Sequence, residues 1–289
     1  MSGRLRETTF SPAPGFMVAG SIEETWFAAH AEPAQLLSLG FRLELGGAHL
    51  ARTMMLAELG RVLTAAPHQI PEKVNSLVLD QNILQTRTGS GRRLSLRHLR
   101  ELYGLGGPAP ITRAMVALWP RAGEGRPLIA LLAALAREVL LRDTAAMILP
   151  APPGAPVGAL DLAGFFERRY PGRYTPKMVR SLSQNCASSW TQSGHLKGKV
   201  RKERARPAVS PAAAAFAALL GSLAGFGGPA LLASPWIAVL DRSGAEVSAL
   251  LRTAERDGLL RLRAGGDVVE IEVKRHMASA LEIPELADH

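Results

Sequence analysis

The sequence contains a single cysteine, Cys186, among its 289 residues. It therefore has no internal disulfide framework and no cluster of thiolate metal ligands, and a reducing compartment is its simplest setting. The opening residues Met1 to Arg6 carry positive charge, but no apolar run follows them, which is not typical of a secretory signal. We therefore expect a cytoplasmic protein.

Motifs for catalysis are also missing. The seven histidines are scattered, with no pair at helical ligand spacing, and there is no nucleophile elbow, paired-aspartate motif, dinucleotide fingerprint or Cys/His cluster. Cys186 has the spacing of an inward-facing helical residue, which favours a core position over a nucleophile. We expect no enzymatic activity, no catalytic residue, no cofactor and no metal, with an active site dispersed along the chain as the alternative.

Charge is absent from one long stretch, Pro207 to Leu240, which exceeds the roughly 20 residues of a membrane-spanning helix. Prolines and glycines interrupt this stretch repeatedly, so we predict two short buried helices, at about 211–224 and 230–240, and no membrane insertion. A membrane span is the alternative interpretation.

Aromatic residues make up only 5% of a chain that is rich in alanine and leucine, a composition that favours helix over strand. We predict a mainly α fold, in which a helical N-terminal domain precedes winged helix-turn-helix modules with short β-hairpins. The expected parts are an N-terminal extension (1–44), a helical domain (45–149), a Pro-rich linker (150–158), a basic helix-turn-helix and wing module (159–206), a C-terminal winged-helix-like domain (207–275) and a tail (276–289).

Positive charge is concentrated in one segment. The net charge is +9, and residues 167–206 hold eleven basic and only two acidic residues, so this segment accounts for the whole excess. The same segment has the order of a winged helix-turn-helix. A helix ends near Arg169, Pro171-Gly172 form a turn, Thr175-Pro176 begin a second helix that runs to about Ser193, and a basic hairpin follows. A site for a polyanion is the first interpretation.

The second helix of this module is the expected reader of DNA. Lysine and arginine neutralise phosphates, while arginine, glutamine and asparagine can also bond base edges. An ordinary solvated helix face is the alternative, although no acidic residue occurs from Arg168 through Lys202. The candidates on and before this helix are Arg173, Thr175, Lys177, Arg180, Ser181, Gln184, Asn185 and Ser188.

The basic hairpin is the expected wing, with a flexible interdomain linker as its alternative. Its candidate phosphate contacts are Lys197, Lys199, Arg201, Lys202 and Arg204. On a helix from about 91 to 103 the arginines are interpreted first as solvated structural residues, with a second phosphate-binding face as the alternative. The candidates on that helix are Arg92, Arg93 and Arg97.

The C-terminal part repeats the order of helix and hairpin. A helix begins at Ser243, and the alternating residues 259–273 predict a hairpin about Gly265-Gly266, with Leu262 opposite Val269 and Arg261 opposite Glu270. This part is net acidic, so we expect it to contact protein rather than DNA.

Three segments resemble the BrxA family of BREX bacteriophage-defence systems. They are Asn82-Ile-Leu-Gln-Thr-Arg with the arginine-rich helix after it, Gly194-His-Leu-Lys-Gly-Lys, and Leu231-Leu-Ala-Ser-Pro-Trp236. The resemblance implies a non-catalytic protein with winged-helix parts that binds duplex DNA beside other BREX-type defence components. The residues themselves leave two alternatives open, a scaffold whose basic segment binds an acidic protein and an RNA-binding module.

Overall fold

The computed structural model describes residues 26–265 and 268–288, and within them the fold is mainly helical with two short antiparallel hairpins. The predicted fold class is confirmed. Part of the predicted N-terminal extension and part of the predicted Gly265-Gly266 turn lie outside the described residues.

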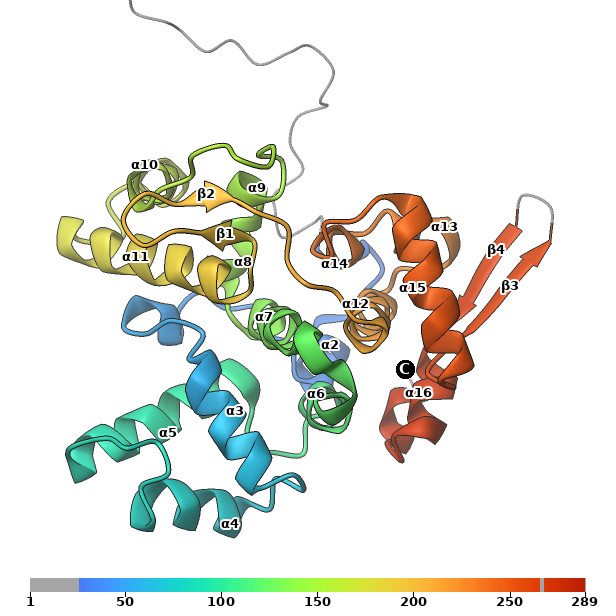
Figure 1. Ribbon diagram of the computed structural model, residues 1–289, viewed down its shortest axis with the longest axis horizontal. Coiled ribbons are helices and arrows are strands. Elements are labelled where there is room, and N and C mark those ends of the chain that lie inside the picture. Colours follow the sequence, from blue (N-terminus) through green and yellow to red (C-terminus); the bar gives the residue numbers. More distant parts are fainter. Residues whose placement is uncertain (1–25, 266–267, 289) are drawn as a thin grey trace, which may run out of the picture.

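Short helices build the first half of the chain (Figure 1). In chain order they are α2 (Pro33–Leu39), η1 (Ala48–Leu50), α3 (Leu56–Ala65), α4 (Pro71–Asn75), η2 (Ser76–Asp80), α5 (Gly89–Tyr103), α6 (Pro110–Leu118), η3 (Pro120–Gly125), α7 (Arg126–Arg137), α8 (Val139–Asp143) and α9 (Ala145–Ile148).

The second half adds both hairpins. Its elements are α10 (Ala159–Arg169), α11 (Pro176–Gln192), β1 (Leu196–Lys197), β2 (Glu203–Arg204), α12 (Pro211–Leu223), α13 (Gly228–Leu232), α14 (Pro235–Ala238), α15 (Gly244–Arg256), β3 (Arg261–Gly265), β4 (Val268–Glu272), α16 (Lys274–Ala280) and η4 (Pro284–Leu286).

Local signals fix where several of these helices begin. The side chains of Thr175, Ser210 and Ser243 each accept a hydrogen bond from the backbone N–H three residues later. A proline follows the first two of these caps, where its missing N–H costs nothing. The start of the basic second helix at Pro176 is therefore where the sequence predicts it.

Two predicted helices are interrupted in the structure. The apolar spacing from Ala48 to Val62 predicts one helix that begins at Gly47. The structure has only the single turn η1 there, and α3 begins after Met55, which has a φ of +50°. The apolar spacing from Leu128 to Leu140 predicts one helix over 126–148, but the helix breaks at Glu138, whose backbone is extended. The two breaks are linked, because the Glu138 carboxylate accepts the backbone N–H groups of Ala48 and His49.

The uncharged segment forms the central helix of the molecule. α12 packs against α6 and α7 on one side and against α14 and α15 on the other (Figure 1). Nearly all of its side chains are buried, including Phe216 and Leu220. Across the residues described, no helix has the length and apolarity needed to cross a membrane. The predicted second helix, 230–240, is split because Ser234 caps a new helix that begins with Pro235.

Residues assigned to the N-terminal extension contribute to the core. Trp26 and Trp236 meet edge to face with ring centroids 4.8 Å apart, and the Trp236 indole N–H donates to the Trp26 carbonyl at 2.8 Å. Leu36 and Leu39 of α2 are also buried. Residues from 26 onward therefore join the core that the rest of the chain builds, while the predicted division into domains stays a prediction.

The β1–β2 hairpin has a third backbone segment at its edge. Val157 N–H donates to the Lys202 carbonyl at 3.0 Å, and Arg204 N–H donates to the Ala155 carbonyl at 2.8 Å. Pro156 pairs with Glu203 in an antiparallel bridge. The segment predicted as a Pro-rich linker thus continues the small sheet, so the hairpin is supported on that side.

The β3–β4 hairpin pairs in a different register from the predicted one. Leu262 lies opposite Ile271, and Arg263 lies opposite Glu270. The difference is two residues, and because side chains alternate with a period of two, both registers place the same residues on each face. The facial pattern in the sequence could not distinguish them.

Candidate nucleic-acid interface

Helix α11 separates a buried face from an exposed basic stripe. Leu182, Cys186 and Trp190 are fully buried, and the Trp190 indole N–H donates to the Thr144 hydroxyl at 2.7 Å. On the opposite side an exposed or half-buried stripe runs along the helix at spacings of three and four residues. This stripe consists of Lys177, Arg180, Gln184, Ser188 and Thr191.

The predicted nucleophile alternative at Cys186 has no structural support. Its thiol is buried, and this burial raises its pKa well above the usual value, with the carboxylates of Glu138 and Asp143 adding to the effect. A thiol that resists ionisation is a poor nucleophile. Cys186 is a packing residue in α11.

Two predicted site residues at the turn before α11 have different roles. Arg173 is exposed, with its guanidinium 5.9 Å from the ring centroid of Tyr174. The Thr175 hydroxyl accepts the Met178 N–H at 3.3 Å, so it caps the helix. Arg173 therefore stands free for an anion near the start of α11, and Thr175 acts by setting the helix start.

Ser181 and Asn185 lie at the edge of the stripe and bind the protein itself. The Ser181 hydroxyl donates to the Leu50 carbonyl at 3.4 Å, and the Asn185 amide donates to the His49 carbonyl at 3.0 Å. Both side chains hold η1 against α11. We therefore remove them from the predicted set of base-reading residues.

A buried network behind α11 was missed in the sequence. His49 contacts the Glu138 carboxylate through Nδ1 at 3.1 Å and the Ser189 hydroxyl through Nε2 at 2.9 Å. The order Ser-His-Glu matches that of a hydrolase triad, but all three side chains are fully buried. The Ser189 oxygen also accepts the Met54 N–H at 2.8 Å. These buried hydrogen bonds therefore hold residues 48–54 against α11.

The hairpin β1–β2 projects a basic tip. Lys197, Lys199 and Arg201 are exposed, and Val200 between them is 94% exposed. Gly198 has a φ of +96°, and a side chain there would meet the Arg201 carbonyl oxygen at 2.1 Å, so the tight turn requires glycine. Lys197 pairs with Glu203 across the hairpin at 3.5 Å. The tip therefore offers Lys199 and Arg201 as its unpaired cations among the described residues.

Lys202 joins the hairpin to the stripe of α11. Its ammonium group donates to the Thr191 hydroxyl at 2.9 Å. Burial lowers the pKa of this lysine from its ordinary value. Because Thr191 ends the exposed stripe, the helix and the hairpin present one continuous surface.

Arg204, a predicted wing contact, is a buried structural residue. It is only 2% exposed, and its guanidinium forms an ion pair with Asp241 at 3.1 Å. It also donates to the carbonyls of Ile148 at 2.8 Å and His195 at 3.2 Å. The reason is strand alternation, since Glu203 points to solvent and its neighbour must point inward. Arg204 is therefore removed from the interface.

The α5 arginines form a separate basic group. Arg93 and Arg97 are exposed, Arg92 is half-buried, and Arg97 lies 3.6 Å from Glu101 on the same helix. The Thr88 hydroxyl caps α5 by accepting the Gly91 N–H at 3.1 Å. The turn η1 contacts both α5 and α11, so it links the two basic groups through the fold.

A groove runs between α10 and α11. It has a volume of about 350 Å3 and is lined by Arg180 and Gln184 on one side and by Leu160 and Glu167 on the other. Leu160 is 88% exposed. The groove places one carboxylate beside the otherwise basic stripe.

In the part of the chain that the structure describes, no three His, Cys, Asp or Glu side chains gather as a metal site. Comparison with protein-family models and with curated proteins finds no match.

Proposed function

We propose that this protein is a non-catalytic, double-stranded DNA-binding protein that holds the duplex mainly through its backbone phosphates. One observation carries the proposal: the exposed stripe of α11 and the basic tip of β1–β2 form one surface, joined where Lys202 donates to Thr191 at 2.9 Å. Helix-turn-helix proteins place their second helix in the major groove, and winged members add a hairpin beside it.

The dimensions of this surface suit a duplex. From Lys177 to Thr191 the stripe extends about 21 Å at the rise of an α-helix, and the major groove admits a helix of this kind. Arg173 at the start of α11 and Lys199 and Arg201 at the hairpin tip flank the stripe. In such an arrangement the flanking cations reach phosphates on either side of the groove.

Sequence selectivity should be weak. The Asn185 amide donates to the His49 carbonyl and is therefore not available to a base. This leaves Gln184 as the amide side chain of the exposed stripe that can contact one. Arg180 is the arginine beside it. Two potential base readers supply little discrimination when each good bidentate contact contributes about 1–3 kcal/mol.

We favour duplex DNA over single-stranded nucleic acid as the ligand. Single-stranded nucleic acids stack their bases on exposed aromatic rings. In the basic segment the two tyrosines pack on each other, with Tyr170 and Tyr174 centroids 6.0 Å apart, and the Tyr170 hydroxyl donates to Asp143. An acidic protein or an RNA remains the alternative partner.

The biological setting is a proposal that rests on the sequence resemblance alone. Three segments resemble the BrxA family, and on that basis we propose a cytoplasmic accessory protein of a BREX-like phage-defence system. Other defence components of that system would then be its protein partners.

A comparison of four ligands tests the proposed function. Full-length protein would be titrated with fluorescent duplex DNA, single-stranded DNA, structured RNA and poly-glutamate at one ionic strength. We expect the duplex to bind at least about tenfold more tightly than the others. Equal or tighter binding of structured RNA or of poly-glutamate would overturn the proposal in favour of that partner.

A further inference from the structure

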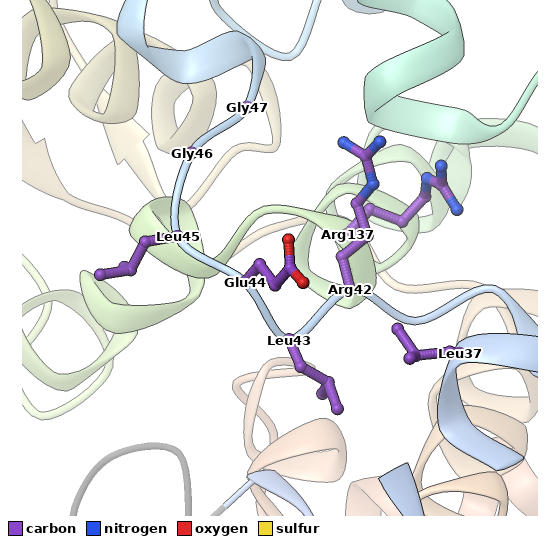
Figure 2. Close-up of a pocket in the computed structure, with 8 residues that line it drawn as sticks. All are labelled: Leu37, Arg42, Leu43, Glu44, Leu45, Gly46, Gly47 and Arg137. Atoms are coloured by element: carbon purple, nitrogen blue, oxygen red, sulfur yellow. The ribbon is translucent and has the colours of Figure 1, made fainter. Parts of the chain in front are cut away.

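A pocket of about 290 Å3 lies between the chain that follows α2 and the end of α7, and none of its lining residues belongs to the α11 stripe (Figure 2). Two arginines, Arg42 and Arg137, extend their side chains to the same side of it. Glu44 and the Gly46-Gly47 pair line the pocket as well. Nothing in the proposed DNA contacts of α11 and its hairpin uses these residues.

The two arginines differ in whether their guanidinium N–H groups have acceptors in the protein. Arg137 donates to the carbonyls of Glu101 at 2.9 Å and Gly40 at 2.7 Å, so its position is fixed. The Arg42 side chain has no hydrogen-bond or ion-pair partner among the described residues. No Arg42 nitrogen is among the buried polar atoms that lack a partner, so this guanidinium is accessible and offers five N–H donors to an anion.

The two arginines of the pocket repel each other. Burial, and after it the charge of Arg42, lowers the pKa of Arg137 to about 10, while the charge of Glu138 acts in the opposite direction. Glu44 lines the pocket but lies beyond ion-pair distance of either arginine. An anion placed between the two guanidinium groups would relieve their repulsion and receive paired, charge-assisted hydrogen bonds.

The glycine pair adds backbone donors. Gly46 and Gly47 have φ values of +133° and +109°, and within the described residues their N–H groups donate to no protein acceptor. A side chain on Gly46 would meet nothing within 4 Å, so this edge is open. Amide groups of such a loop can supplement arginines at an anion site.

We propose that this pocket binds one phosphate group, held by Arg42 and Arg137. Phosphate suits it because the unpartnered Arg42 guanidinium can present paired donors to a tetrahedral anion. Arg137 already donates to backbone carbonyls through Nε, Nη1 and Nη2, and it adds its positive charge and its remaining N–H groups. The phosphate can belong to a small phosphorylated molecule or to a nucleic-acid backbone. The site needs no contribution from α11, so it does not rest on the proposed function.

Inorganic phosphate is the direct probe. Binding to the full-length protein would be measured by calorimetry and thermal shift against chloride at equal ionic strength. Arg42→Ala removes the unpartnered guanidinium without touching the contacts of Arg137. We expect phosphate affinity to fall at least about tenfold. Arg121→Ala, which removes an exposed arginine elsewhere, should leave it unchanged, and Glu44→Gln should strengthen it.

Two results would overturn the site: no phosphate effect beyond that of chloride, or an equal effect in the wild type and in Arg42→Ala. Duplex titrations of Arg42→Ala then separate the sources. A weaker duplex affinity assigns the pocket to a backbone phosphate, and an unchanged duplex affinity with lost phosphate binding assigns it to a free phosphorylated molecule. Phosphate binding that persists when the duplex fails to bind at all would contradict the DNA proposal and leave the pocket standing.

Discussion

Two hydrogen bonds join His49 and Glu138, both to the same carboxylate oxygen. The backbone N–H of His49 lies 3.2 Å from Glu138 Oε2, and its ring Nδ1 lies 3.1 Å from it. The other oxygen accepts the Ala48 N–H at 3.0 Å. Through Ser189 the same network reaches α11, so one buried carboxylate positions the segment that lies beside the proposed interface.

A substitution at Gly47 tests the tightness of this arrangement. A methyl group on Gly47 would meet the Glu138 carboxylate at 2.4 Å, and its φ of +109° disfavours any other residue. We expect Gly47→Ala to lower the free energy of unfolding by about 3 kcal/mol, measured by denaturant titration. Gly46→Ala is the matched control, because it shares the backbone strain but meets no atom within 4 Å. Equal losses in both variants would contradict the close fit at Glu138.

Low pH should destabilise the fold through His195. This residue is buried, and desolvation lowers its pKa from 6.5 to about 3, with the charges of Arg204 and Arg242 acting in the same direction. In the unfolded chain His195 therefore binds a proton below about pH 6.5, whereas in the folded chain it stays neutral down to about pH 3. Between these values the free energy of unfolding should fall by about 1.4 kcal/mol per pH unit from this group.

The control for this pH dependence is His195→Gln. The variant has no imidazole to titrate, so its stability should decline less steeply between pH 6.5 and pH 5 than that of the wild type. Identical slopes for the two proteins would show that other groups cause the decline.

Two arginines three residues apart should behave in opposite ways. Arg204→Ala leaves Asp241 and two buried carbonyls without their donor, so we expect a stability loss of about 3–5 kcal/mol. Arg201→Ala removes an exposed cation and should change stability by less than about 0.5 kcal/mol. Thermal unfolding and duplex titration of both variants check this, and a stable Arg204→Ala protein with weakened DNA binding would restore Arg204 to the interface.

The stripe on α11 can be tested separately from the hairpin. Changing Lys177, Arg180 and Gln184 together to alanine should weaken duplex binding and leave stability nearly intact, because all three are exposed. A uniform loss across DNA sequences with a smaller salt slope would mean that α11 contacts phosphates, which we expect. A loss confined to preferred sequences would show that it reads bases.

The parts of the fold that the sequence predicts are those with local signals. Thr175-Pro176 identifies the start of α11, and apolar spacing identifies its buried side. The contact of His49 with Glu138 joins positions 89 residues apart, and its contact with Ser189 spans 140. No local pattern encodes such pairings, which is why the helix expected from Gly47 was too long.

The candidate site also combines features that local spacing predicts with features that depend on distant residues. The exposed positions of Lys177, Arg180 and Gln184 follow from helical spacing. The inward orientation of Arg204 depends on strand alternation and on Asp241, which lies in another part of the chain. The pocket of Arg42 and Arg137 depends on residues 95 positions apart and could be found only in three dimensions.

The salt dependence of duplex binding tests the central claim most directly. The slope of log affinity against log salt would be measured for the wild type, for Lys199→Ala/Arg201→Ala, and for Arg121→Ala/Arg252→Ala, a control that removes two exposed cations elsewhere. If the hairpin tip holds two phosphates, the first variant should bind more weakly with a slope smaller by about 2, and the control should match the wild type. An unchanged affinity and slope in the hairpin variant would contradict a phosphate-binding interface on β1–β2 and α11.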